Sequence, residues 1–135
     1  MKRTITLLSM LFCTFVINGL GTVALAQTTP EIAKGNCAAC QTDLEKTLRY
    51  CTDKRGKYAE AQFTNIIKDA ITACKMTEEF MTRGSSYQNK AAEICVEACT
   101  QCAKACDSFK DDDRLKACAN ECRKTAGNCS KVALK

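Results

Sequence analysis

The sequence contains no histidine and no tryptophan, and its only proline is Pro30. Histidine supplies most of the general acid–base groups that work near neutral pH, and it is the usual ligand in zinc, haem and non-haem iron sites. The absence of histidine therefore argues against many classes of enzyme and against these metal centres. We expect that the protein is not an enzyme.

A strong charge imbalance is also missing. The chain has 20 basic and 15 acidic residues, a net charge of +5 at pH 7, and the charges are scattered along its length. Nucleic-acid-binding proteins concentrate basic residues on one face or along one helix, and this sequence does not. We therefore expect no nucleic-acid partner.

The first 26 residues have the pattern of a secretory signal peptide. Lys2 and Arg3 form a short basic region, and residues 4–26 carry no charge and end in the small-x-small sequence Ala-Leu-Ala. This pattern predicts cleavage after Ala26 and a mature domain of residues 27–135. The mature protein would be exported to the periplasm or the exterior of a bacterial cell, with no membrane attachment. A retained signal anchor is the alternative, because the uncharged run is long enough to span a bilayer.

The 12 cysteines are the most unusual feature of the composition. Cys13 lies in the predicted signal peptide, and eleven cysteines remain in residues 27–135. In a short exported protein this density first suggests a disulfide scaffold. An odd number, however, leaves at least one thiol unpaired, and the positions follow helical periodicity, whereas dense disulfide scaffolds are usually rich in loops.

Periodicity and helix-end signals predict four helices, and no segment alternates as a strand does. The expected helices span residues 29–56, 57–83 and 85–109, and a fourth starts at the acidic run 111–113. Helices of about 20 residues joined by loops of two to four residues favour an all-α, antiparallel four-helix bundle.

The ends of these helices carry recognisable residues. Thr29 is the expected N-cap of the first helix, with Pro30 in its first helical position, and Gly56 ends it. Gly84 stops the second helix, and Ser85 or Ser86 caps the third. The acidic run lies at a helix start, where negative charge is favourable.

A four-residue frame with the spacing four, three, four recurs in each predicted helix, and this spacing keeps its members on one helix face. In chain order the frame holds Cys40, Leu44, Thr47 and Cys51; Phe63, Ile67, Ala70 and Cys74; Cys95, Cys99, Cys102 and Cys106; and Cys118, Cys122, Thr125 and Cys129. Cysteine thus occupies positions where a bundle helix normally carries Leu, Ile or Val. Only the second helix keeps an ordinary apolar face, which allows part of the bundle to pack by burial. The sequence predicts a bundle with a Cys-lined core.

Two interpretations of these cysteines need no metal. A buried free cysteine acts as a small hydrophobe, and this interpretation suits Cys74 taken alone. The stronger rival is a helical hairpin stapled by two disulfides, Cys102–Cys122 and Cys106–Cys118, in a module that binds a partner protein. The staple leaves seven cysteines unexplained.

Metal binding accounts for the spacing itself, because residues four apart on a helix lie about 5–6 Å apart at Cβ. Thiolates without imidazoles or carboxylate clusters favour Cu(I), and zinc held by four thiolates is the alternative for any single cluster. The loop pattern of ferredoxin iron–sulfur sites is absent from the sequence. A thiol oxidoreductase built on Cys37 and Cys40 would need a βαβ context, which the sequence also lacks.

Two segments, CVEACTQCAKAC (95–106) and CANECRKTAGNC (118–129), resemble the Cys-rich four-helix-bundle copper storage proteins, whose thiolate-lined bundles bind many Cu(I) ions. The resemblance covers most of residues 31–131. The resemblance implies Cu(I) ligands at the cysteines whose positions match the family's motif: Cys95, Cys99, Cys102, Cys106, Cys118, Cys122 and Cys129. It implies further ligands, less tightly matched and placed by the four-residue frame only, at Cys37, Cys40, Cys51 and Cys74.

The same resemblance implies a function. We expect an exported protein that stores several Cu(I) ions, exchanges copper with a donor or acceptor protein, and forms a homo-oligomer, in this family often a tetramer. The sequence departs from the family pattern at three points: it has no histidine at a channel mouth, few cysteines in the second helix, and Thr125 where a thiol would lie.

Overall fold

The computed structural model describes residues 27–135, which form four α-helices and a short 3₁₀-helix without any strand. The elements are α1 (Thr29–Lys54), η1 (Gly56–Ala59), α2 (Ala61–Thr82), α3 (Gln88–Asp107) and α4 (Asp113–Ala133). The predicted all-α class is confirmed. The predicted signal peptide lies outside the described residues.

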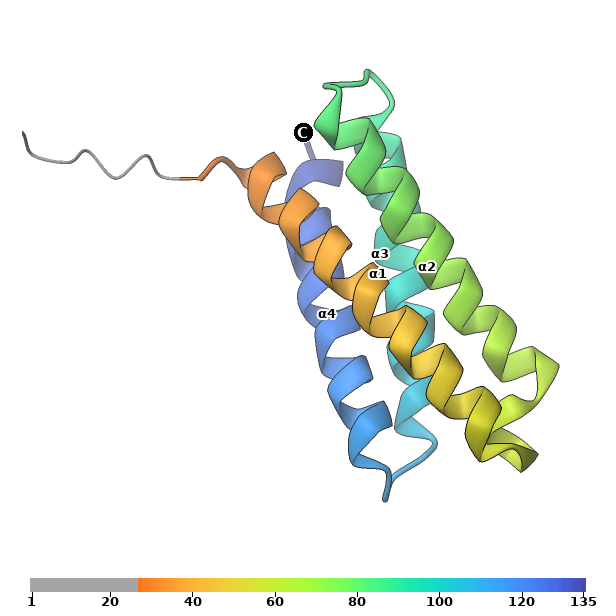
Figure 1. Ribbon diagram of the computed structural model, residues 1–135. Helices are drawn as coiled ribbons and strands as arrows, with labels where there is room; N and C mark the ends of the chain where they lie inside the picture. Colours follow the sequence, from red (N-terminus) through yellow and green to blue (C-terminus); the bar gives the residue numbers. More distant parts are fainter. Residues whose placement is uncertain (1–26) are drawn as a thin grey trace, which may run out of the picture.

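The four helices form a ring in which each helix packs against two others. α1 and α3 both pack against α2 and α4, and within residues 27–135 the backbones of the diagonal pairs, α1 with α3 and α2 with α4, do not approach closely. Successive helices run in opposite directions (Figure 1). The predicted antiparallel bundle is therefore confirmed. None of the four described helices has the apolar length that a membrane crossing requires.

The bundle has two distinct ends. The start of α1, residues 83–87 between α2 and α3, and the end of α4 share one end, which we call the terminal end (Figure 1). The other end, which we call the η1 end, holds residues 55–60 and the α3–α4 connection, residues 108–112.

Hydrogen bonds at the helix starts explain where α1 and α4 begin. Thr28, not Thr29 as predicted, is the N-cap of α1, and its amide donates to Glu31 Oε2 at 2.9 Å. Asp112 is the N-cap of α4 and accepts from the Leu115 amide at 3.0 Å. The acidic run therefore starts α4 as predicted, because a carboxylate satisfies a free amide at this position.

The connections between helices are longer than predicted. Arg55 and Gly56 have consecutive positive φ angles of 62° and 56°, so the chain leaves α1 in a left-handed turn and continues into η1. As a result α2 starts at Ala61 instead of residue 57. The third helix also begins later than predicted, at Gln88. Gly56, the predicted end of the helix, does have a positive φ, whereas Arg55 before it is not a glycine and gave no signal that the turn starts one residue earlier.

All members of the four-residue frame are buried. Leu44 and Ile67 are fully buried among the cysteines, whereas the nearby Leu48 and Ile66, outside the frame, are only partly buried. The antiparallel ring brings the four frames face to face, so the cysteines meet along the bundle axis.

Candidate metal centre

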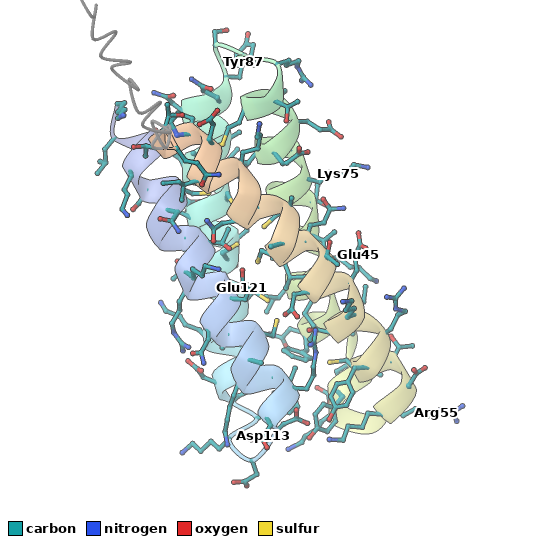
Figure 2. The ribbon with its side chains drawn as sticks, turned by 60° about the vertical axis from the view of Figure 1, so that its left-hand side comes forward. Glu45, Arg55, Lys75, Tyr87, Asp113 and Glu121 are labelled. Atoms are coloured by element: carbon teal, nitrogen blue, oxygen red, sulfur yellow. The ribbon has the colours of Figure 1, made fainter. Side chains whose placement is uncertain are left out.

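Every helix contributes cysteines to the core. α1 carries Cys37, Cys40 and Cys51; α2 carries Cys74; α3 carries Cys95, Cys99, Cys102 and Cys106; and α4 carries Cys118, Cys122 and Cys129. All eleven are free thiols with at most 1% of their surface exposed. Figure 2 shows the sulfur atoms between the helices, while charged side chains such as Glu45 and Lys75 point outward. The two bridges of the disulfide interpretation are not formed among these residues.

The first cluster lies near the terminal end and joins three helices. Cys37 Sγ is 3.4 Å from Cys129 Sγ and 3.9 Å from Cys95 Sγ. The three sulfur atoms all lie within 4.8 Å of one another. For a metal–sulfur bond of about 2.3 Å, three thiolates around one ion lie about 4 Å apart. The spacing of this terminal cluster fits one such ion with little movement.

Two further clusters occupy the middle of the bundle. Cys74 Sγ lies 3.8 Å from Cys95 Sγ and 3.6 Å from Cys99 Sγ, which are themselves 3.9 Å apart. Cys99 also forms a cluster with Cys40 and Cys122, whose sulfur atoms are 4.0 Å apart. Both clusters have the same compact spacing as the terminal one, with all sulfur atoms within 4.8 Å of one another.

The fourth cluster lies toward the η1 end and consists of Cys102, Cys118 and Cys122. Cys106 belongs to none of the clusters, but its pKa is affected by the neighbouring Cys102 and Cys118 thiols. Cys51 belongs to none of the four clusters. Burial, and after it charge repulsion from the neighbouring Cys118, raise the pKa of Cys51 to about 11. The four linked clusters thus contain nine of the eleven predicted ligands, and Cys51 and Cys106 lie beside them.

Shared cysteines join the four clusters into a continuous path. Cys95, Cys99 and Cys122 each belong to two successive clusters. A thiolate that bridges two ions spreads its negative charge over both of them. Burying an uncompensated charge is unfavourable, so bridging lowers the electrostatic penalty of a metal-filled core. The arrangement suits a row of neighbouring soft ions better than isolated sites.

Hydrogen bonds among the thiols determine where protons are held. Hydrogen bonds from Cys129 and then Cys37 lower the pKa of Cys95 far below the usual value for a thiol. The pKa of Cys74 is raised instead, by its hydrogen bonds first with Cys37 and then with neighbouring thiols, and by burial. The pKa is raised for seven of the eleven core thiols, and these stay neutral when no metal is bound. Because thiolates are the metal ligands, metal binding has to release protons.

Two frame positions carry threonine instead of cysteine, and both hydroxyls bond to backbone. Thr47 Oγ1 donates to the Asp43 carbonyl at 2.9 Å and accepts from Arg114 Nη2 at 2.7 Å. Thr125 Oγ1 donates to the Asn36 carbonyl at 3.4 Å. Hydroxyl oxygen is a harder donor than thiolate, so neither threonine substitutes for a sulfur ligand of a soft ion.

A cluster of aromatic rings and one ion pair covers the η1 end of the path. The Phe109 ring centroid lies 4.6 Å from that of Tyr58 and 4.7 Å from that of Phe63. Beside them the buried Asp112 carboxylate accepts from Lys54 Nζ at 2.7 Å. Sequence reasoning missed this cluster, because its members come from different elements and no periodic pattern links them. It separates the thiols at this end from solvent.

Linked clusters of buried thiols along the axis of an all-α bundle define a protein that binds soft metal ions in its core. The sequence profile of the copper storage protein family matches residues 26–134, and the chain belongs to this family. Family membership confirms the resemblance based on residues 95–106 and 118–129, and with it copper as the metal.

Solved structures share the fold. A crystal structure of a protein from Nitrosospira multiformis is 26% identical, with a TM-score of 0.73, over 78% of this chain and 95% of that one. A copper storage protein solved with Cu(I) bound is 19% identical, also with a TM-score of 0.73, over 78% of this chain and 99% of that one. At this identity the second structure shows a shared fold. No curated protein matches the sequence.

Proposed function

We propose that the protein is an exported copper store that sequesters several Cu(I) ions on the thiolates of its core. The path of four clusters joined by Cys95, Cys99 and Cys122 is the observation that carries the proposal. Its sulfur spacing fits bridged soft-metal binding, and the chain belongs to the copper storage protein family.

The donor set favours Cu(I) over other common ions. Magnesium and calcium require oxygen ligands, and the buried clusters offer only sulfur. A structural zinc ion would need one closed site of four ligands, whereas these thiols form a row of three-sulfur clusters. If two thiolates bind each ion, the chain binds a minimum of about five Cu(I) ions, and thiolates that bridge two ions raise this number.

The proposed role is storage, not catalysis. The pattern of residues 1–26 supports export, and an exported store would protect the cell envelope from copper or hold copper for a cuproprotein. It would receive and deliver copper through carrier proteins, and we propose a homo-oligomer as the assembled form.

Titration of the reduced protein with Cu(I) against a chromophoric chelator, under anaerobic conditions, tests the proposal. We expect tight binding of at least about five ions per chain. The same protein with its thiols alkylated after denaturation is the control and should bind none. Tight binding of one ion or none by the reduced protein would contradict the proposal.

A count of free thiols under native and denaturing conditions distinguishes storage from the disulfide-stapled alternative. Storage requires that the denatured, unreduced protein show nearly all of its thiols free. A count that falls by four would instead indicate two bridges, as the disulfide-stapled alternative requires.

A further inference from the structure

The pair of Cys37 and Cys129 stands out within the thiol network by its distance and its place. Their sulfur atoms, 3.4 Å apart, are the closest contact among the cysteine pairs measured in the core. The two residues lie on different helices, α1 and α4, and 92 positions apart in the chain. A disulfide bond is about 2 Å long, so a small side-chain rotation brings these sulfur atoms to bonding distance.

Cys129 also lies close to a helix end. α4 ends at Ala133, one turn beyond Cys129, and the exposed Leu134 follows. Terminal turns of helices open more readily than central ones. Opening of this turn would expose Cys129 without unfolding the rest of the bundle.

The two ends of the bundle are held together differently. The three ion pairs that join different helices or their caps in residues 27–135 are Lys54–Asp112, Asp43–Arg114 and Asp107–Arg123. Each has a partner within residues 107–114, in or beside the α3–α4 connection. Near the terminal end, α1 and α4 are joined by the longer 3.4 Å hydrogen bond from Thr125 to Asn36. Local opening is therefore easier at the terminal end.

We propose that Cys37 and Cys129 form a redox-active pair that a small-molecule disulfide, such as glutathione disulfide, oxidises to a bond between α1 and α4. The Cys129 thiolate attacks one sulfur of the reagent and releases its other half as a thiol. The Cys37 thiolate then attacks Cys129 Sγ and releases the second half. Two cysteine thiols are oxidised, the reagent is reduced to two thiols, and the protons of the cysteines pass to the released thiolates.

The consequence for copper rests on the proposed storage function. Oxidation removes two of the three sulfur ligands of the terminal cluster, and its third, Cys95, also belongs to the next cluster. The other three clusters contain neither Cys37 nor Cys129 and keep all their thiols. Oxidation at this pair would therefore release copper from the terminal end and leave the rest in place.

The test uses the purified, reduced, metal-free protein incubated with glutathione disulfide, alkylated at intervals and mapped by mass spectrometry without reduction. Cleavage after lysine and arginine isolates Cys129 in peptide 125–131, while Cys37 and Cys40 share peptide 35–46. We expect a link between these two peptides to form first. It should be absent in Cys129→Ser and Cys37→Ser and present in Cys51→Ser, all checked for folding by circular dichroism. An earlier link between other peptides, no link at all, or a link that survives in Cys37→Ser would overturn the proposal.

Copper titration of the oxidised and reduced forms tests copper storage separately from the Cys37–Cys129 disulfide. We expect the oxidised form to bind about one ion fewer per chain. If the reduced protein binds no copper, storage fails while the mapping still decides on the disulfide. If copper binds but the Cys37–Cys129 link does not form, only the redox inference fails. Equal copper binding by the linked and reduced forms would overturn the inferred release.

Discussion

The sulfur atom of Cys74 lies 3.6 Å from that of Cys99, and this contact brings the single thiol of α2 into the metal centre. Cys95 and Cys99 lie 3.9 Å apart on the same helix, and among residues 27–135 the one cluster that contains both of them is completed by Cys74. Cys74 completes their cluster and so connects the terminal end of the path with its middle. A small-hydrophobe role suited Cys74 when the sequence alone was considered, but its contacts favour a role as ligand.

Substitution of Cys99 should lower copper capacity more than substitution of Cys51. Cys99 belongs to two clusters and Cys51 to none, although both are fully buried. We expect Cys99→Ser to lose about one to two bound ions and Cys51→Ser at most one. Competitive Cu(I) titration measures the difference, and both variants should keep the helical circular dichroism spectrum. Equal losses would show that the clusters do not define the binding sites.

Loading with copper should stabilise the fold. Cysteine in place of Leu, Ile or Val removes apolar burial worth roughly 1 kcal/mol per site, so we expect the metal-free bundle to be weakly stabilised. An ion that binds only the folded state adds stability by mass action. We expect the melting temperature to rise stepwise with added Cu(I) and to stay constant with Mg²⁺ or Ca²⁺, followed by circular dichroism. A melting temperature insensitive to copper would contradict a metal role for the core.

Asp112 should contribute to stability through its charge. Burial alone would raise its pKa, but hydrogen bonds from Lys54 and Tyr50 outweigh burial and hold the pKa of Asp112 below its usual 3.8. We expect Asp112→Asn to lower the free energy of unfolding by about 1–3 kcal/mol at pH 7. Asp111→Asn, at an exposed neighbouring residue, is the control and should change little.

Acid pH offers a second check on the same carboxylate. A lowered pKa stabilises the fold above the unfolded value of 3.8, and this contribution is lost as the pH falls below it. Urea unfolding of the wild type and Asp112→Asn should therefore differ fully above about pH 4, and the difference should shrink progressively as the pH falls further toward the lowered folded-state pKa. A difference that does not shrink as the pH falls below about 4 would mean that the side chain acts by its shape.

Cys51 should make the metal-free protein sensitive to alkali. Its pKa is raised from 9.0 to about 11, so the neutral thiol stabilises the fold fully below pH 9 and this contribution is lost as the pH rises toward 11. We expect wild type to lose about 1–3 kcal/mol more than Cys51→Ser between pH 8 and pH 11, because a hydroxyl does not titrate there. Parallel urea titrations at the two pH values compare the proteins. Equal losses in both would contradict the assigned shift.

The inward faces of the helices were predictable, but several helix boundaries were not. Apolar residues and cysteines recur with the helical period, and every member of the frame is buried in the structure. The start of the turn at Arg55 was not predicted, because a positive φ at a residue other than glycine has no sequence signal of its own. The later start of α2 followed from that turn.

The sequence by itself determined that cysteines line the core of a four-helix bundle, since the period and the residue types are local properties. Only the tertiary structure decided which thiols meet. Cys51 and Cys74 hold equivalent positions in the frame, yet Cys74 lies within a cluster and Cys51 lies outside all four. The difference arises because the contacts of a core side chain depend on how far each helix is shifted along its neighbours and on the side-chain rotamer. These quantities are set by packing among all four helices and are not encoded in the spacing along any one of them.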